Sequence, residues 1–214
     1  MIEFTTHPIQ GQLMFSLEGI DHGLLYGIHQ ARQPWLSLAM TFLSRSTSTM
    51  PICCLMVLFS CWCLRHPRLR LRAVLFPLFL LAGALAIEIL KRLVERERPN
   101  IVPWVLPETT VNGWSFPSGH AGINSLFVVL VVGTIPSVQG LNITKLAAIL
   151  VGASWVFLVG FNRIYLGVHW PTDVLAGWTL GTLLGFLGLL VAGLIECGRT
   201  GQNQTLDSQK ADKS

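Results

Sequence analysis

Residues 73–99 read AVLFPLFLLAGALAIEIL and then KRLVERERP, an apolar run that ends abruptly in a cluster of charged side chains. The apolar part approaches the roughly 20 residues that a helix needs to cross a membrane. Four other stretches come close to this length, at residues 50–64, 120–136, 146–162 and 172–195. The sequence therefore predicts an all-α fold, a polytopic membrane helical bundle of five to six transmembrane helices.

The composition supports this prediction. Of the 214 residues, 51% are hydrophobic and only 12% are charged, whereas a soluble domain of this length needs more charge to cover its surface. The net charge of +4 comes mainly from short loops beside apolar runs, where it reports membrane orientation. We expect membrane lipids as partners and no nucleic acid, and the pattern leaves the oligomeric state open.

The chain divides into three predicted parts. Residues 1–33 form an N-terminal amphipathic segment in the membrane interface, or alternatively a cytosolic helix packed on the bundle, because apolar residues recur at helical spacing in Leu13, Leu17, Ile20, Leu24 and Ile28. Residues 34–196 form the membrane domain. Its first run, at residues 34–44, is apolar but short, so the sequence leaves open whether this run crosses the membrane. Residues 197–214 are polar and predict a disordered cytoplasmic tail.

The arginines predict the orientation of the bundle. Four of them fall within residues 65–72, and the positive-inside rule places this loop in the cytoplasm. Alternating crossings then put residues 91–116 and 163–171 on the outer side. These two outer loops carry the unusual polar residues, so we expect them to converge.

Two polar clusters flank the predicted spans on the outer side. Lys91 and Arg98 are seven residues apart, so they lie near one face if the helix continues, although such a cluster also serves as an interface anchor. Ser118, Gly119 and His120 then open a helix, where a serine cap, a close backbone approach and free amides suit a phosphate. A capped helix with an incidental histidine is the alternative.

A third cluster contains Arg163, His169 and Asp173. Pro171 stands where a helix would begin, which places Asp173 in its first turn, four residues after His169. A carboxylate beside a histidine can fix the tautomer of the ring and stabilise the imidazolium. The alternative is a structural cap without a catalytic role.

Taken in order, Lys-x6-Arg-Pro, Pro-Ser-Gly-His and Arg-x5-His-x3-Asp resemble the motifs of the phosphatidic acid phosphatase type 2 superfamily, over roughly residues 73–195. The resemblance implies that His169 attacks phosphorus and forms a phosphohistidine, that Asp173 holds its ring, and that His120 protonates the leaving group. It also implies a set of phosphate-binding residues: Lys91, Arg98, Ser118, Gly119 and Arg163. Asn162 departs from the serine that family members usually have there.

The resemblance further implies a lipid phosphate or diphosphate phosphohydrolase that works without a metal or other cofactor. We expect it in the bacterial inner membrane, with its site facing the periplasm or exterior and with undecaprenyl diphosphate or a phosphatidic-acid-type lipid as substrate. A lipid phosphotransferase with the same phosphohistidine is one alternative, and a non-catalytic lipid-binding or transport protein is another. The segment 100–116, with Trp104 and Trp114, either gates substrate entry or anchors the loop in the interface.

Overall fold

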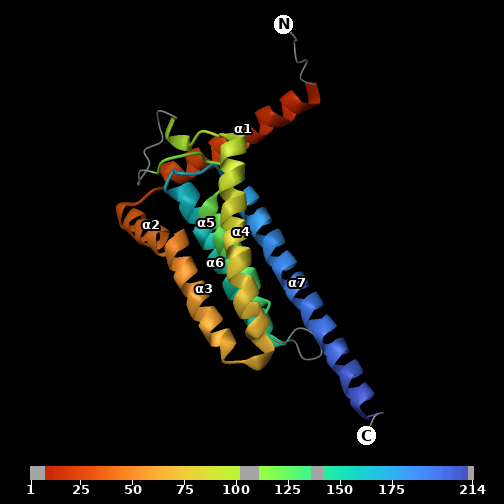
Figure 1. The fold of residues 1–214 in the computed structure, drawn as a ribbon. Helices are drawn as coiled ribbons and strands as arrows, with labels where there is room; N and C mark the ends of the chain where they lie inside the picture. Colours follow the sequence, from red (N-terminus) through yellow and green to blue (C-terminus); the bar gives the residue numbers. More distant parts are fainter. Residues whose placement is uncertain (1–7, 102–110, 136–141, 212–214) are drawn as a thin grey trace.

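A computed structural model describes residues 8–101, 111–135 and 142–211 of the chain. The helices in these ranges are α1 (Pro8–Gln30), α2 (Pro34–Ser46), α3 (Thr49–Leu64), α4 (Arg70–Val94), α5 (Gly119–Val132), α6 (Ile143–Tyr165) and α7 (Pro171–Ala211), with short 3-10 turns at Pro67–Leu69 and Pro99–Ile101. The described residues contain no strand, so the predicted all-α class is confirmed. Figure 1 shows the helices side by side, with α1 across one end. Trp104, one of the two tryptophans named in the 100–116 segment, lies outside the described ranges.

Three stretches are long and apolar enough to cross a membrane alone: Pro67–Val94, Ile143–Tyr165 and Pro171–Arg199. The helices α2 and α3 are long and apolar enough only when they are taken together, as one span bent by 52°. The apolar helix α5 has 14 residues and is about 21 Å long, shorter than a bilayer core of about 30 Å. By length and composition the described residues thus provide three or four spans, and the predicted five to six are not confirmed.

The bundle is apolar both inside and outside. Its core is a cluster of buried side chains from α3, α4, α5 and α7: Ile52, Met56, Phe76, Leu80, Ile87, Ile123, Leu126, Leu130 and Ala192. The outer faces of the long helices carry exposed leucines, among them Leu58, Leu81, Leu85, Leu183 and Leu190. Apolar residues on the outer face are what a lipid environment favours, and the chain is a membrane protein.

Helix α5 lies at the centre of the bundle, where it packs against α3, α4, α6 and α7. Its approach to α7 depends on glycine. A Cβ atom at Gly177 would lie 2.5 Å from the carbonyl oxygen of Ser118, and one at Gly181 would collide with the carbonyl oxygen of Gly122. Small residues let two membrane helices come this close. The contact fixes the beginning of α5 beside the beginning of α7.

Helix α1 presents several apolar residues outward. Leu17, Ile20 and Leu24 are exposed, whereas Asp21 and Leu25 are buried against the bundle. In Figure 1, α1 lies at the end of the bundle where α4 ends and α7 begins. The helix that the sequence predicts is therefore present, but its position in a membrane interface is not confirmed.

Helix α7 continues to Ala211 and extends past the turn between α3 and α4 (Figure 1). The sequence predicts a disordered tail over 197–214, and the helical backbone of residues 197–211 differs from that prediction. The last ten of these residues lack glycine and proline, which are the strongest helix breakers. The helix can therefore continue where the apolar pattern stops.

Candidate active site

The three predicted clusters come together at the end of the bundle where α4 ends. Lys91 lies in the last turn of α4, His120 in the first turn of α5, and Arg163 in the last turn of α6. The charge of Lys91 interacts with those of Arg98, Arg163 and Asp173, and His120 interacts with His169 and Arg163. The amide of Ser118 donates to the carbonyl oxygen of Asp173 at 3.0 Å, which joins the second cluster to the third.

His169 occupies the connection between α6 and α7 and is only 2% exposed. Its Nδ1 lies 3.5 Å from Oδ2 of Asp173 and 3.4 Å from the hydroxyl of Ser115. Its Nε2 lies 3.3 Å from NH1 of Arg98, which is a donor only. The carboxylate therefore favours a proton on Nδ1, and the lone pair on Nε2 faces the guanidinium.

Several effects together lower the pKa of His169 from 6.5 to about 4, and burial is the largest of them. The positive charges of Arg163 and Arg98 also lower this pKa, while the hydrogen bond and charge of Asp173 oppose the change. The ring is thus neutral at neutral pH. A neutral imidazole with a lone pair on one ring nitrogen can act as a nucleophile.

Asp173 is fully buried and accepts hydrogen bonds from several directions. Its Oδ2 accepts from the hydroxyl of Ser115 and, at 2.9 Å, from the amide of Trp170. Its Oδ1 accepts from Arg96 at 2.7 Å. These donors keep the carboxylate ionised and fix its direction toward His169.

Arg98 is a buried cation that mainly donates hydrogen bonds to the backbone. It donates to the carbonyl oxygens of Gly113 at 2.8 Å, Val168 at 2.7 Å and Trp114 at 3.0 Å. Burial lowers the pKa of Arg98, and the charge of Asp173 opposes this change. The sequence predicts a phosphate-binding role for this residue, and the structure adds that it holds the loop at Gly113 and Trp114 against the residue before His169.

Two buried polar atoms in the site have no hydrogen-bond partner among the described residues: Nε of Arg163 and the hydroxyl of Ser118. Buried donors of this kind are costly unless something binds them. Both residues were predicted to contact phosphate. A Cβ atom at Gly119 would lie 3.8 Å from Ile87, an ordinary contact, so packing within the protein does not require glycine there.

Several residues of the site belong to no motif that the sequence analysis singled out. The carbonyl oxygen of Ser44 lies 3.2 Å from Nε2 of His120, and its hydroxyl accepts from NH1 of Arg163. Asn162 donates to the carbonyl oxygen of Met40 at 2.6 Å, so it holds α2 rather than facing the site. The other missed residues are Asp21, Arg96, Ser115 and Thr172. Arg96 stood inside the first cluster and Ser115 just before the second, whereas Ser44 and Asp21 gave no signal.

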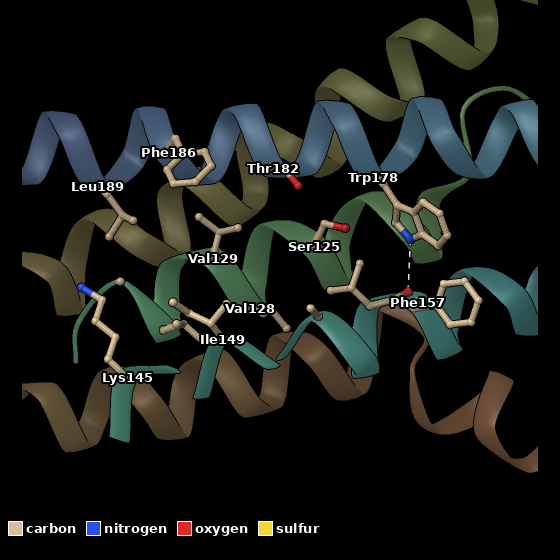
Figure 2. Close-up of a pocket in the computed structure, with 14 residues that line it drawn as sticks. Ser125, Val128, Val129, Lys145, Ile149, Phe157, Trp178, Thr182, Phe186 and Leu189 are labelled. Atoms are coloured by element: carbon tan, nitrogen blue, oxygen red, sulfur yellow. Dashed lines mark hydrogen bonds between the residues drawn. The ribbon is translucent and has the colours of Figure 1, made fainter. Parts of the chain in front are cut away.

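A separate cavity of about 610 Å³ lies between α5, α6 and α7. Its walls are mainly apolar. Figure 2 places Trp178 at one end, where its indole N–H donates to the carbonyl oxygen of Val156 at 3.1 Å, and Lys145 at the other. None of the predicted site residues lines this cavity. The polar site and the apolar cavity are therefore distinct.

Comparison with known proteins agrees with this geometry. Residues 72–194 match the model of the PAP2 superfamily. The chain is 32% identical over 173 residues to phosphatidylglycerophosphatase B of Bacillus subtilis, an alignment that covers 80% of this chain and 83% of that protein. It is 37% identical over 106 residues to the undecaprenyl-diphosphatase of Sulfolobus acidocaldarius, covering 49% of this chain and 47% of that protein.

Two solved structures are similar to the chain. One is the crystal structure of a transmembrane PAP2 type phosphatidylglycerolphosphate phosphatase from Bacillus subtilis, with a TM-score of 0.70, 28% identity and coverage of 81% of this chain and 84% of that one. The other is Aquifex aeolicus LpxE, with a TM-score of 0.63, 24% identity and coverage of 78% and 93%. The second likeness concerns the fold alone.

Proposed function

Because this chain belongs to the PAP2 superfamily, we propose that it is a membrane phosphatase that removes phosphate from a lipid phosphate or diphosphate through a phosphohistidine on His169. The observation that carries the proposal is the setting of this ring. It is buried and neutral, with Asp173 on its Nδ1 side and Arg98 beside Nε2. A nucleophile and the residue that orients it are thereby placed next to a cation.

In the first step, the Nε2 lone pair of His169 attacks phosphorus, and an N–P bond forms while the bond from phosphorus to the leaving oxygen breaks. His120, in its protonated form, gives a proton to that oxygen and becomes neutral. The ring of His169 becomes cationic, and Asp173 stabilises it. Water then attacks phosphorus, gives a proton to His120 and breaks the N–P bond, which restores both histidines.

The phosphate oxygens would be bound by Lys91, Arg98, Arg163, Ser118 and the Gly119 amide. Phosphoryl transfer depends mainly on positioning and on neutralising the charge of these oxygens. The unpartnered Nε of Arg163 and hydroxyl of Ser118 support this assignment. With three cations available, the proposed reaction needs no metal ion.

The proton on His120 can be assigned to an atom. A carbonyl oxygen only accepts, so the contact with Ser44 favours a proton on Nε2 of the neutral ring. In the protonated ring that acts as the acid, the proton exchanged with the leaving group and with water would then be carried by Nδ1. Ser44 thus fixes the tautomer of the proposed acid, as Asp173 does for the nucleophile.

The arginines support a site on the outer face of a bacterial inner membrane. The four arginines of residues 65–72 lie at the turn between α3 and α4, the opposite end of the bundle from the site (Figure 1). The positive-inside rule places that turn in the cytoplasm. Since the relatives are named for phosphatidylglycerophosphate and undecaprenyl diphosphate, we propose a lipid of one of these two kinds as substrate, or a related phosphatidic acid.

The proposal is tested by phosphate release from purified protein in detergent with EDTA, using undecaprenyl diphosphate and phosphatidic acid. We expect release by the wild type and by His66→Ala, a histidine at the far end of the bundle, but background release by His169→Ala. Equal release by wild type and His169→Ala would overturn the histidine mechanism. Wild-type protein that passes phosphate only to an added lipid alcohol would instead be a phosphotransferase.

A further inference from the structure

A second layer of charge lies behind the carboxylate of Asp173. Arg96, in the loop after α4, donates from NH1 to Oδ1 of Asp173 at 2.7 Å and to the hydroxyl of Thr172 at 2.6 Å. Its NH2 donates to Oδ2 of Asp21 at 2.6 Å. The guanidinium also lies over the ring of Trp170, 5.5 Å from its centre. One arginine therefore bridges two carboxylates, one of them in the proposed catalytic pair.

Asp21 reaches this arginine from α1 and is only 1% exposed. Besides Arg96 it binds Thr172 twice: Oδ1 accepts from the amide at 2.9 Å, and Oδ2 accepts from the hydroxyl at 2.5 Å. The amide of Thr172 belongs to the first turn of α7, where the helix itself supplies no acceptor. Asp21 therefore caps α7 from another helix, in a position where a negative charge is favoured.

The two oxygens of Asp173 are consequently divided between two tasks. Oδ1 is held by Arg96, which leaves Oδ2 directed at Ser115, Trp170 and Nδ1 of His169. Asp21 in turn holds the guanidinium at its other nitrogen. If Arg96 were not held by Asp21, it could turn about its contact with Asp173, and the carboxylate could turn with it. An arginine that bridges two carboxylates is suited to this task because its donors have a fixed planar geometry.

We infer that Asp21 and Arg96 are positioning residues for the proposed reaction, which set the direction of Asp173 and through it the ring of His169. The inference rests on the proposed function. Neither residue touches the reacting atoms, and both act through the orienting carboxylate. The N-terminal helix is thus part of the phosphatase site rather than only a membrane attachment.

The test removes the charge of each positioning residue in turn. In Asp21→Asn an amide group faces donors that need an acceptor, and in Arg96→Gln the bridge is lost. We expect each to lower kcat by about ten- to a hundredfold, the size of a lost hydrogen bond to a charged group, with KM within about twofold. The double variant should be no worse than the poorer single one, because both changes break the same connection.

Matched controls come from the same elements. Glu18→Gln removes an exposed carboxylate one turn earlier on α1, and Arg92→Gln removes an exposed cation whose partner is Glu88. Both should keep wild-type kcat. Arg96→Lys keeps the charge but not the planar set of donors, so its kcat should lie between those of Arg96→Gln and the wild type. Wild-type kcat in Asp21→Asn, or additive losses in the double variant, would overturn the inference.

A second readout does not depend on turnover. The ¹⁵N shifts of the His169 ring, assigned by comparison with His169→Ala, report which nitrogen carries the proton. We expect Asp21→Asn to change these shifts at neutral pH and Glu18→Gln to leave them unchanged. If the wild type releases no phosphate, the proposed function fails but the ring shifts still test the positioning role. Unchanged shifts in Asp21→Asn would contradict that role in an active or inactive protein.

Discussion

The carbonyl oxygen of Ser44 lies 3.2 Å from Nε2 of His120, so α2 contacts the proposed general acid directly. The hydroxyl of Ser44 also accepts from NH1 of Arg163. A single residue at the end of α2 therefore contacts both the proposed acid and a proposed phosphate ligand. Because its backbone and its side chain have separate partners, a substitution can remove one contact and keep the other.

Ser44→Ala should strengthen inhibition by inorganic phosphate. The variant keeps the carbonyl contact with His120 but leaves NH1 of Arg163 without the serine hydroxyl, so a phosphate oxygen need not compete for that donor. We expect the inhibition constant to fall about two- to tenfold, the range of one net hydrogen bond. Ser46→Ala is the control, since the Ser46 hydroxyl bonds only within α2. Weaker inhibition in Ser44→Ala would show that Ser44 orients Arg163 for phosphate instead.

Asp173→Asn should lower kcat by about a thousandfold or more, with little change in KM. The amide has nearly the shape of the carboxylate but lacks its charge, so the cationic ring formed in the first step loses its stabilising partner. Kinetics of the purified variant check this, with Glu97→Gln as an exposed acidic control. A variant that retains a tenth of wild-type kcat would contradict the role given to Asp173.

The pH dependence of kcat/KM should show an acid limb near pH 4. The reactive form of His169 is the neutral ring, and its pKa is lowered to about 4 by burial and by two arginines. Below about pH 4, protonation of His169 should therefore remove the nucleophile and reduce kcat/KM about tenfold per pH unit. A soluble phosphate monoester itself titrates at about pH 6, so its own ionisation is measured separately and subtracted from the profile. An acid limb near 6.5 would indicate a ring with an ordinary pKa.

Gly181→Ala should destabilise the bundle. Its Cβ would collide with the carbonyl oxygen of Gly122, so α7 must move away from α5, at a cost of about 1–3 kcal/mol. Gly193→Ala, on the same helix with nothing within 4 Å, should leave stability unchanged or raise it by up to about 1 kcal/mol. Thermal unfolding in detergent compares the two. Equal midpoints would mean that α5 and α7 are not held together at this point.

The sequence was sufficient for the outline of the site because its main residues stand at the ends of apolar runs. Lys91, His120 and Arg163 each end or begin a helix, so the alternation of crossings predicts that they meet. The number of crossings was less certain because α5 is short and because α2 and α3 form a bent pair. Hydropathy measures how apolar a segment is, and it does not measure the angle at which two segments join.

The supporting residues could not be predicted for a different reason. Asp21 lies in a helical pattern where it reads as part of a polar face, and its burial becomes visible only when α1 packs on α7. Arg98 was expected to bind phosphate, but three of its contacts are to backbone carbonyl oxygens whose positions depend on loop folding. Such contacts join distant parts of the chain and leave no local spacing to recognise.

The bend between α2 and α3 has a consequence for how variants of the site are interpreted. An interrupted helix leaves carbonyl oxygens without their usual helical partners, and here polar groups of α5 lie against two of them. Asn124 donates to the carbonyl oxygen of Thr47 at 3.0 Å, and His120 faces that of Ser44. Replacing His120 by alanine therefore removes the proposed proton donor and also a polar contact to the backbone of this bend, so inactivity in that variant has two separable physical origins.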